Sequence, residues 1–407
     1  MNTSSETALK NDHSPFVQKT VYSVLFSIAF AHLLNDLLQA VIPAAYPILK
    51  ENFNLTFTQI GLITLAYQLA ASILQPIVGL YTDKKPKPFS QIFGMLFTLS
   101  GIVFLSYAVS FSMIIISVIL VGIGSSIFHP EASRISFLAS GGKRGLAQSI
   151  FQLGGNAGTA IGPLLVALIV VPNTQHYIIW FVIVAIIGLI VLSRIALWYQ
   201  NHLSLRATKK AVIDLPNLSQ TKINISIALL LVLIFSKFFY MASMSSYFTF
   251  YLIEKFGLSV QEAQFHLVLF LASCAVGTLI GGPLGDKFGR KYVIWFSVLG
   301  AAPFTLLLPF VDLFWTGILS VAIGTIISSA FPAILVFAQE LLPKKLGTVS
   351  GLFYGFAFGM GGLGSALLGN LADHKGIIYV YYLCAYLPLI GIIAFFLPNL
   401  KKKSVNS

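Results

Sequence analysis

The sequence predicts an all-α polytopic membrane protein, with twelve transmembrane helices in two six-helix bundles. Of its 407 residues, 57% are hydrophobic and only 9% are charged, whereas soluble domains carry about 25% charged residues. Apolar segments of ~20 residues, each long enough to cross ~30 Å of hydrocarbon as a helix, recur along the chain. They lack the alternation over about 10 residues that is typical of membrane β-strands.

The chain also repeats itself after roughly 200 residues, and such a repeat decides the architecture. Residues 282–291 read G-x-L-x-D-x-x-G-R-K, and residues 79–87 form a weaker copy of that stretch. Asp83 and Asp286 occupy equivalent places in the two copies and are 203 residues apart. We therefore expect two bundles of the same topology.

The predicted spans follow the apolar runs. They are 20–46, 58–80, 89–109, 112–133, 146–171 and 177–199 in the first half, and 225–250, 262–284, 291–311, 313–337, 347–371 and 377–397 in the second. The resulting parts are a tail (1–19), an N-terminal bundle (20–199), a polar linker (200–222), a C-terminal bundle (223–398) and a basic tail (399–407). Residues 1–19 lack the features of a secretory signal, so the first span is expected to stay as an internal signal-anchor.

Positive charge is concentrated on one side of this topology. With the N-terminus inside, nineteen Lys and Arg residues lie on that side, against Lys50, Lys255 and Lys375 on the other. The positive-inside rule then places both termini in the cytoplasm of a cell with a bacterial-type cytoplasmic (inner) membrane. The net charge of +12 is explained by topology and lipid contact, and no nucleic-acid partner is predicted.

Two sets of six helices around a charged linker, together with the G-x-L-x-D-x-x-G-R-K stretch, resemble the major facilitator superfamily. The first copy departs from that signature at Pro86 and Lys87. At finer grain, residues 32–36, 125–131 and 147–156 look like the fosmidomycin-resistance type of efflux transporter. The resemblance implies the major facilitator fold, transport by alternating access, and fosmidomycin-like phosphonates as substrates.

The first predicted span, 20–46, carries a polar face. His32, Asn35, Asp36 and Gln39 fall at i, i+3, i+4 and i+7, which puts all four on one side of a helix. Ionisable groups within a span are costly and face a bundle interior or a watery cavity, where a carboxylate can carry a proton. We interpret Asp36 as a proton-coupling residue and the other three as substrate-binding residues. The alternative is a structural polar seam.

Lys237 lies about half-way along the seventh predicted span, 225–250, with Tyr240 on roughly the same face. One interpretation is that both residues bind an anionic substrate. The other is a structural ion pair between Lys237 and Asp36 across the cavity. The two interpretations do not exclude each other.

His129, Glu131 and Arg134 lie at the end of the fourth predicted span, 112–133. His129 is a candidate for a proton relay because histidine titrates near physiological pH, and Glu131 is a further proton-coupling candidate. The alternative is that Glu131 and Arg134 are charges that snorkel to the cytoplasmic surface.

The fifth predicted span, 146–171, shows two faces. Gln152 and Asn156 belong to a polar stripe suited to hydrogen bonds with a substrate or with helix 1. The other face is smooth and allows close approach between helices. It is similar to the G-x-x-x-G-P motif of drug/proton antiporters and consists of Gly154, Gly158, Gly162 and Pro163. We interpret these residues as a packing surface that slides during transport, with static packing as the alternative.

The two loop signatures have a mechanical interpretation. A carboxylate at the inner end of a helix can cap a neighbouring helix N-terminus or pair with a basic residue, and glycine permits a tight turn. Such contacts are expected to latch the outward-facing state, with the larger effect from the better-matched second copy. The latch residues are Gly79, Asp83, Gly282, Asp286, Gly289 and Arg290. The alternative is that the carboxylates are ordinary loop caps.

These features predict a secondary active transporter that exports a small polar or anionic compound by proton antiport, as a monomer and without a cofactor. A proton-coupled symporter and a non-transporting membrane sensor remain open as alternatives. No loop is long enough for a catalytic constellation, and residues 359–364 match G-x-G-x-x-G without a preceding strand, so no enzyme is predicted. No second His or Cys lies at ligand spacing from His129 along the chain, so no metal site is predicted either.

Overall fold

The structure is a computed structural model that describes residues 20–400 except 56, 171, 209–217 and 259. The first half contains α1 (Tyr22–Ala44), α2 (Tyr46–Phe53), α3 (Phe57–Lys84), α4 (Ser90–Ser106), α5 (Phe111–Ala139), α6 (Arg144–Leu165), η1 (Val166–Val170), η2 (Gln175–Trp180) and α7 (Phe181–Thr208). The second half contains α8 (Gln220–Phe256), α9 (Val260–Phe288), α10 (Arg290–Leu299), α11 (Ala302–Leu307), η3 (Leu308–Phe310), α12 (Leu313–Ser328), α13 (Ala330–Leu341), α14 (Leu346–Lys375), α15 (Ile377–Cys384) and η4 (Leu387–Phe396).

These elements account for twelve membrane spans within the described residues. Ten helical stretches are long and apolar enough to cross a membrane. The other two spans are α4, which is apolar but shorter, and α6, which carries the polar stripe of helix 5. The fold is therefore the all-helical one that the sequence predicts.

Three spans of the second half are interrupted, and proline explains each interruption. A proline removes the hydrogen bond to the carbonyl four residues earlier and clashes with it. Helices α10, α12 and α15 end at Leu299, Ser328 and Cys384. Each of these residues stands four positions before a proline, namely Pro303, Pro332 and Pro388.

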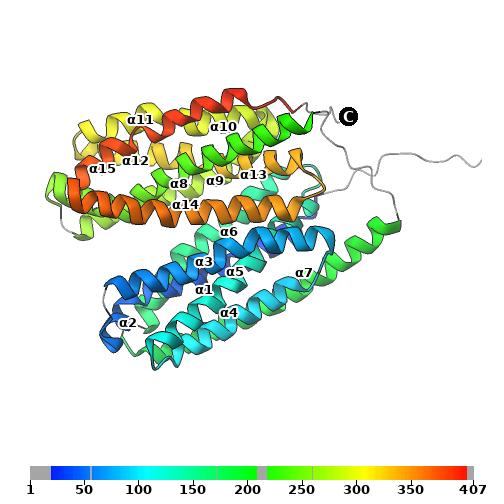
Figure 1. Cartoon of the computed structure of the whole chain (residues 1–407), viewed down its shortest axis with the longest axis horizontal. Helices are drawn as coiled ribbons and strands as arrows, with labels where there is room; N and C mark the ends of the chain where they lie inside the picture. Colours follow the sequence, from blue (N-terminus) through cyan, green and yellow to red (C-terminus); the bar gives the residue numbers. More distant parts are fainter. Residues whose placement is uncertain (1–19, 56, 171, 209–217, 259, 401–407) are drawn as a thin grey trace, which may run out of the picture.

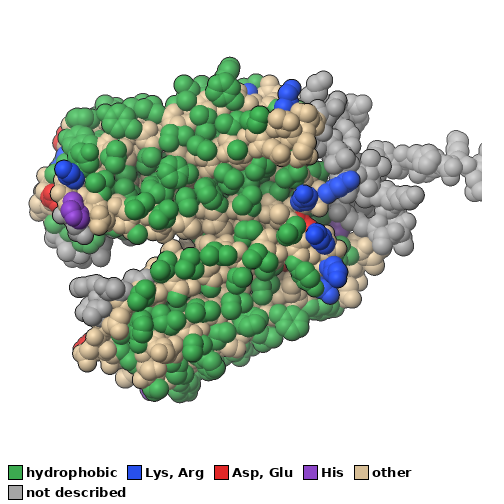
Figure 2. All heavy atoms as spheres, in the orientation of Figure 1, with side chains coloured by type: hydrophobic (Ala, Val, Ile, Leu, Met, Phe, Trp, Pro, Cys, Tyr) green, Lys and Arg blue, Asp and Glu red, His purple; other side chains and the backbone are tan. Residues whose placement is uncertain are grey.

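The two halves lie side by side as separate bundles, with α1–α7 in one and α8–α15 in the other (Figure 1). Helix α3 packs against α14, and α6 packs against α9, so each half contributes equivalent helices to the interface. The outer surface is largely hydrophobic, and Lys and Arg gather at one end of the molecule (Figure 2). At the opposite end a cleft opens between the halves. We call the two ends the basic end and the cleft end.

Candidate functional site

A buried cluster joins α1 to α5. Asp36 Oδ2 lies 3.2 Å from His32 Nε2, and Asp36 Oδ1 lies 3.5 Å from His129 Nε2. Both histidines are buried, while the Asp36 side chain retains 15% of its exposure. We call these three residues the His–Asp–His cluster. The spacing rule missed it, because His129 stands on a different helix and 93 residues beyond Asp36.

The rest of the polar face of α1 supports the Asp36 carboxylate. The Asn35 and Gln39 side-chain amides donate to Asp36 Oδ1 at 3.0 and 3.2 Å. Gln39 Oε1 in turn accepts hydrogen bonds from Tyr67 and from Ser125. The four residues of the predicted face thus meet at one place. The amides of Asn35 and Gln39 hold the Asp36 carboxylate in place.

Backbone carbonyls fix the orientation of both imidazoles. His32 Nδ1 lies 2.7 Å from the Phe151 carbonyl oxygen, and His129 Nδ1 lies 3.0 Å from the Ser125 carbonyl oxygen. A carbonyl oxygen only accepts, so each Nδ1 must carry the hydrogen. In the neutral rings Nε2 is then an acceptor, and both Nε2 atoms face the carboxylate of Asp36.

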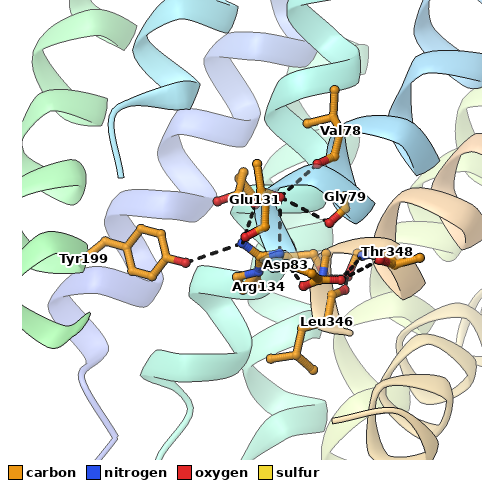
Figure 3. Close-up of polar contacts among 12 residues, drawn as sticks. Val78, Gly79, Asp83, Glu131, Arg134, Tyr199, Leu346 and Thr348 are labelled. Atoms are coloured by element: carbon orange, nitrogen blue, oxygen red, sulfur yellow. Dashed lines mark hydrogen bonds and ion pairs between the residues drawn. The ribbon is translucent and has the colours of Figure 1, made fainter. Parts of the chain in front are cut away.

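Glu131 lies apart from this cluster, in a second network at the basic end (Figure 3). Its carboxylate pairs with Arg134 at 2.7 Å, and Arg134 also pairs with Asp83 and reaches Tyr199. Glu131 and Arg134 are both buried. The interpretation of these two residues as snorkelling surface charges is therefore wrong, because the neighbouring helices and the second half cover them.

Asp83 connects this network to the other half of the molecule. Its carboxylate accepts from the backbone N–H groups of Gly347 and Thr348 at 2.9 and 2.7 Å, and from the Thr348 hydroxyl at 2.6 Å (Figure 3). The first N–H groups of a helix lack intrahelical partners and carry partial positive charge. Asp83 on α3 thus caps the N-terminus of α14 across the interface.

Asp286 makes the mirrored contact. It accepts from the backbone N–H groups of Gly145 and Leu146, both at 3.1 Å, at the start of α6. It also pairs with Arg290 at 2.9 Å, and Glu340 bridges Arg290 and Arg144. Gly289, just before Arg290, has φ +100°, a conformation that favours glycine. Both carboxylates of the repeated signature therefore bind helix N-termini of the opposite half.

Glycine pairs allow these two crossings. A Cβ atom on Gly79 would overlap the backbone of Gly347, and a Cβ atom on Gly282 would overlap the backbone of Gly145. The sequence offset relates one pair to the other. The close approach of the two halves at the basic end therefore requires glycine at all four positions.

Substitution Gly282→Val is expected to hold the basic end open. Its side chain would meet the Gly145 backbone, which has no flexible atoms that can move aside. Labelling of Ser133→Cys, a position buried between the halves by Gln339 and Ser350, should become at least ten times faster. The control is Gly361→Ala on α14, where an added Cβ meets nothing within 4 Å. Unchanged labelling in Gly282→Val would contradict the steric role of the crossing.

The glycines of α6, the fifth predicted span, pack within one half. Added Cβ atoms on Gly154, Gly158 and Gly162 would meet backbone or Cβ atoms of α1, and these two helices belong to the same bundle. This favours static packing for the three glycines. The side chain of Pro163, which the motif includes, lies outside the described residues.

The polar stripe of α6 instead reaches across the interface. Tyr354 on α14 donates to Gln152 Oε1 at 2.6 Å and accepts from Gln148 Nε2 at 2.7 Å. The same tyrosine ring packs against His129, with centroids 5.3 Å apart. Asn156 is half-buried on the same helix. The His–Asp–His cluster is thus in contact with a residue that closes the interface.

Lys237 and Tyr240 lie in the second half. Lys237 is buried and its ammonium lies over the rings of Phe238 and Phe331, at 5.2 and 5.3 Å from their centroids. Within the described residues no Asp or Glu forms an ion pair with it. The ion pair with Asp36, one of the two interpretations, is not formed in this conformation, because α1 and α5 supply histidines as the partners of Asp36. Tyr240 packs in the core of the second half.

Comparison with known proteins then decides the family. A family model described as the Major Facilitator Superfamily matches residues 28–260 and 229–407. The chain belongs to the major facilitator superfamily. It is accordingly an integral membrane transporter of small molecules and no enzyme, as the sequence predicts.

Relatives within the superfamily cover nearly all of this transporter. It is 56% identical over 386 residues, 95% of both chains, to the fosmidomycin resistance protein of Escherichia coli strain K12. It is 44% identical over 388 residues, 94% of both chains, to the uncharacterized MFS-type transporter YfnC of Bacillus subtilis strain 168. Among solved structures, FucP in the outward conformation matches with a TM-score of 0.73 at 17% identity, over 94% of this chain and 100% of that one. The last match supports the fold alone.

Proposed function

We propose that this transporter exports a small anionic compound of the fosmidomycin type in exchange for protons. The observation that carries the proposal is the 56% identity, over 95% of both chains, to the fosmidomycin resistance protein of Escherichia coli. Alternating access supplies the mechanism: one end of the interface is closed by the two capped crossings, while the other end opens into a cleft (Figure 2).

The charge distribution supports an orientation for this cycle. Because Lys and Arg gather at the basic end and cytoplasmic loops are enriched in these residues, we place the basic end and both termini in the cytoplasm. The closed basic end then corresponds to an outward-facing state. The Asp83 and Asp286 contacts would stabilise that state and break when the substrate is to be taken up from the cytoplasm.

The His–Asp–His cluster is the proposed site of proton coupling. Three acceptor groups face one another there, and each contact between Asp36 and a histidine requires one added proton to become a hydrogen bond. His129 also packs on Tyr354 and Phe358 of α14. A change in the protonation of His129 would therefore act directly on α14, the helix whose N-terminus Asp83 caps. Glu131, locked to Arg134, is better suited to the latch than to carrying the proton.

Lys237 is the proposed anion-binding group. A buried cation without a carboxylate partner is costly, and an anionic substrate would supply the missing charge. The aromatic rings of Phe238 and Phe331 stabilise the ammonium in the meantime. Tyr240, buried away from the cluster, would support the fold of this region.

Substitution Lys237→Gln is expected to lower fosmidomycin resistance at least tenfold, while Lys237→Arg keeps part of it. The assay is drug susceptibility in a host stripped of its own exporters, with membrane levels of each variant matched. Wild type should also protect poorly against a neutral ester of the same drug. Full resistance conferred by Lys237→Gln would remove the residue-level support for an anionic substrate. If a host that expresses the wild-type transporter gains no resistance to fosmidomycin, the proposed function itself is contradicted.

A further inference from the structure

We infer that the His–Asp–His cluster is a binding site for a divalent transition-metal ion of the zinc class. One ligand atom from each of His32, Asp36 and His129 lies within 4.8 Å of the others. Neighbouring ligands of a tetrahedral zinc ion stand about 3.3 Å apart, since each is 2.0–2.1 Å from the metal. The separations of His32 Nε2 from Asp36 Oδ2 and of His129 Nε2 from Asp36 Oδ1, 3.2 and 3.5 Å, are close to that spacing, each to a different carboxylate oxygen.

The hydrogen-bond pattern leaves the Nε2 lone pairs of both histidines facing the Asp36 carboxylate. Both Nδ1 atoms are committed to backbone carbonyls, so both Nε2 atoms present lone pairs to the carboxylate. His129 Nε2 is completely buried and has no hydrogen-bond partner. An unpartnered buried acceptor facing another acceptor is unfavourable, and a cation between them resolves the conflict.

The surrounding residues resemble the outer shell of a metal site. Metal-bound histidines almost always donate their second ring N–H to a carbonyl or carboxylate, which fixes their orientation. Here the carbonyls of Phe151 and Ser125 accept those hydrogens, and the amides of Asn35 and Gln39 hold the carboxylate.

Gly155 leaves room for two of the ligand atoms. A Cβ atom on Gly155 would overlap His32 Nε2 and Asp36 Oδ2, which are two of the ligand atoms. The partial exposure of Asp36 leaves one side of the cluster open, where water can complete a four-coordinate shell. Three protein ligands with an open fourth position form the arrangement seen in catalytic zinc sites.

The donor set selects the class of ion. Two imidazole nitrogens and one carboxylate suit zinc, copper, nickel or cobalt, whereas calcium and magnesium prefer shells of oxygen ligands. This inference does not rest on the proposed export function. A carrier of another substrate, or one coupled in the other direction, would present the same three ligands.

The test uses purified full-length protein in detergent, after removal of any histidine tag. Titration with Zn²⁺ alone is expected to show one saturable site per chain by calorimetry. Co²⁺ should give the intense visible absorption of a tetrahedral ion, and Zn²⁺ should displace it. Neither readout depends on transport, so failure here and failure of drug export are separate results.

Three variants locate the site. His129→Ala and Asp36→Asn should each weaken Zn²⁺ affinity at least tenfold and remove the Co²⁺ absorption. Gly155→Ala keeps all ligands but fills their space, and it should weaken affinity as well. His176→Ala, whose ring bonds to the Ser106 carbonyl, is the matched control and should bind like wild type. Size-exclusion profiles confirm folding.

Two results would overturn the inference. The first is a wild-type protein without saturable Zn²⁺ binding or tetrahedral Co²⁺ absorption. The second is a set of folded His129→Ala and Asp36→Asn proteins that bind both ions as wild type does. In that case the ions would occupy another place on the chain.

Discussion

Substitution Asp36→Asn is expected to abolish proton-driven export while leaving exchange of substrate for substrate partly intact. Asn has nearly the same shape but cannot take up a proton, and it removes the charge that faces His32 and His129. Uptake of labelled drug into inverted vesicles, with and without a pH gradient, measures the effect.

Asn35→Ala is the control for this experiment. It removes one hydrogen bond to the same carboxylate but leaves its charge and both histidines, and a hydrogen bond to a charged group contributes about 1.5–3 kcal/mol. We expect a weaker defect that still responds to the pH gradient. Flux through Asp36→Asn that rises with the gradient as in wild type would exclude Asp36 as the proton-coupling residue.

Substitution Asp83→Asn is expected to open the basic end by the largest amount of any single latch variant. It removes the charge from contacts with two N–H groups and the Thr348 hydroxyl and breaks the buried pair with Arg134. The Arg134 pair lies within the first half, so the opening follows from the contacts to Gly347 and Thr348. Hydrogen bonds to a charged group contribute about 1.5–3 kcal/mol each. Cytoplasmic labelling of Ser133→Cys should therefore rise at least tenfold. The two native cysteines are buried, which keeps the background low.

Asp286→Asn serves as the matched comparison. The better-matched sequence signature around Asp286 predicts the larger effect there, but the contacts favour the reverse order. Asp286 keeps 21% of its exposure against 8% for Asp83, and it lacks a hydroxyl donor. Equal labelling in wild type and both variants would reduce these carboxylates to ordinary helix caps.

The sequence predicts the fold well because its signals are local or repeated. Span length and the 203-residue offset act on the backbone where they stand. The prolines four residues beyond Leu299, Ser328 and Cys384 also act locally, but the predicted spans run through them without interruption. The polar face of α1 is found for the same reason: helical periodicity brings Asn35 and Gln39 to the Asp36 carboxylate.

The partners of that face could not be predicted in this way. The sequence suggests Lys237 as a partner of Asp36, and only the packing of α5 against α1 brings His129 to that carboxylate instead. Burial of Glu131 and Arg134 depends likewise on contacts with distant segments, because their position near a span end suggests exposure. Composition and spacing carry no signal for such long-range contacts.

The most direct test of proton-coupled export records the lumen pH of acidified inverted vesicles, in which the cytoplasmic face points outward. Addition of fosmidomycin to the medium should make the lumen more alkaline, because drug enters the vesicle as protons leave. The response should be absent with Asp36→Asn and in vesicles without the carrier. A lumen that stays unchanged while labelled drug accumulates, or that becomes more acidic on drug addition, would contradict proton antiport.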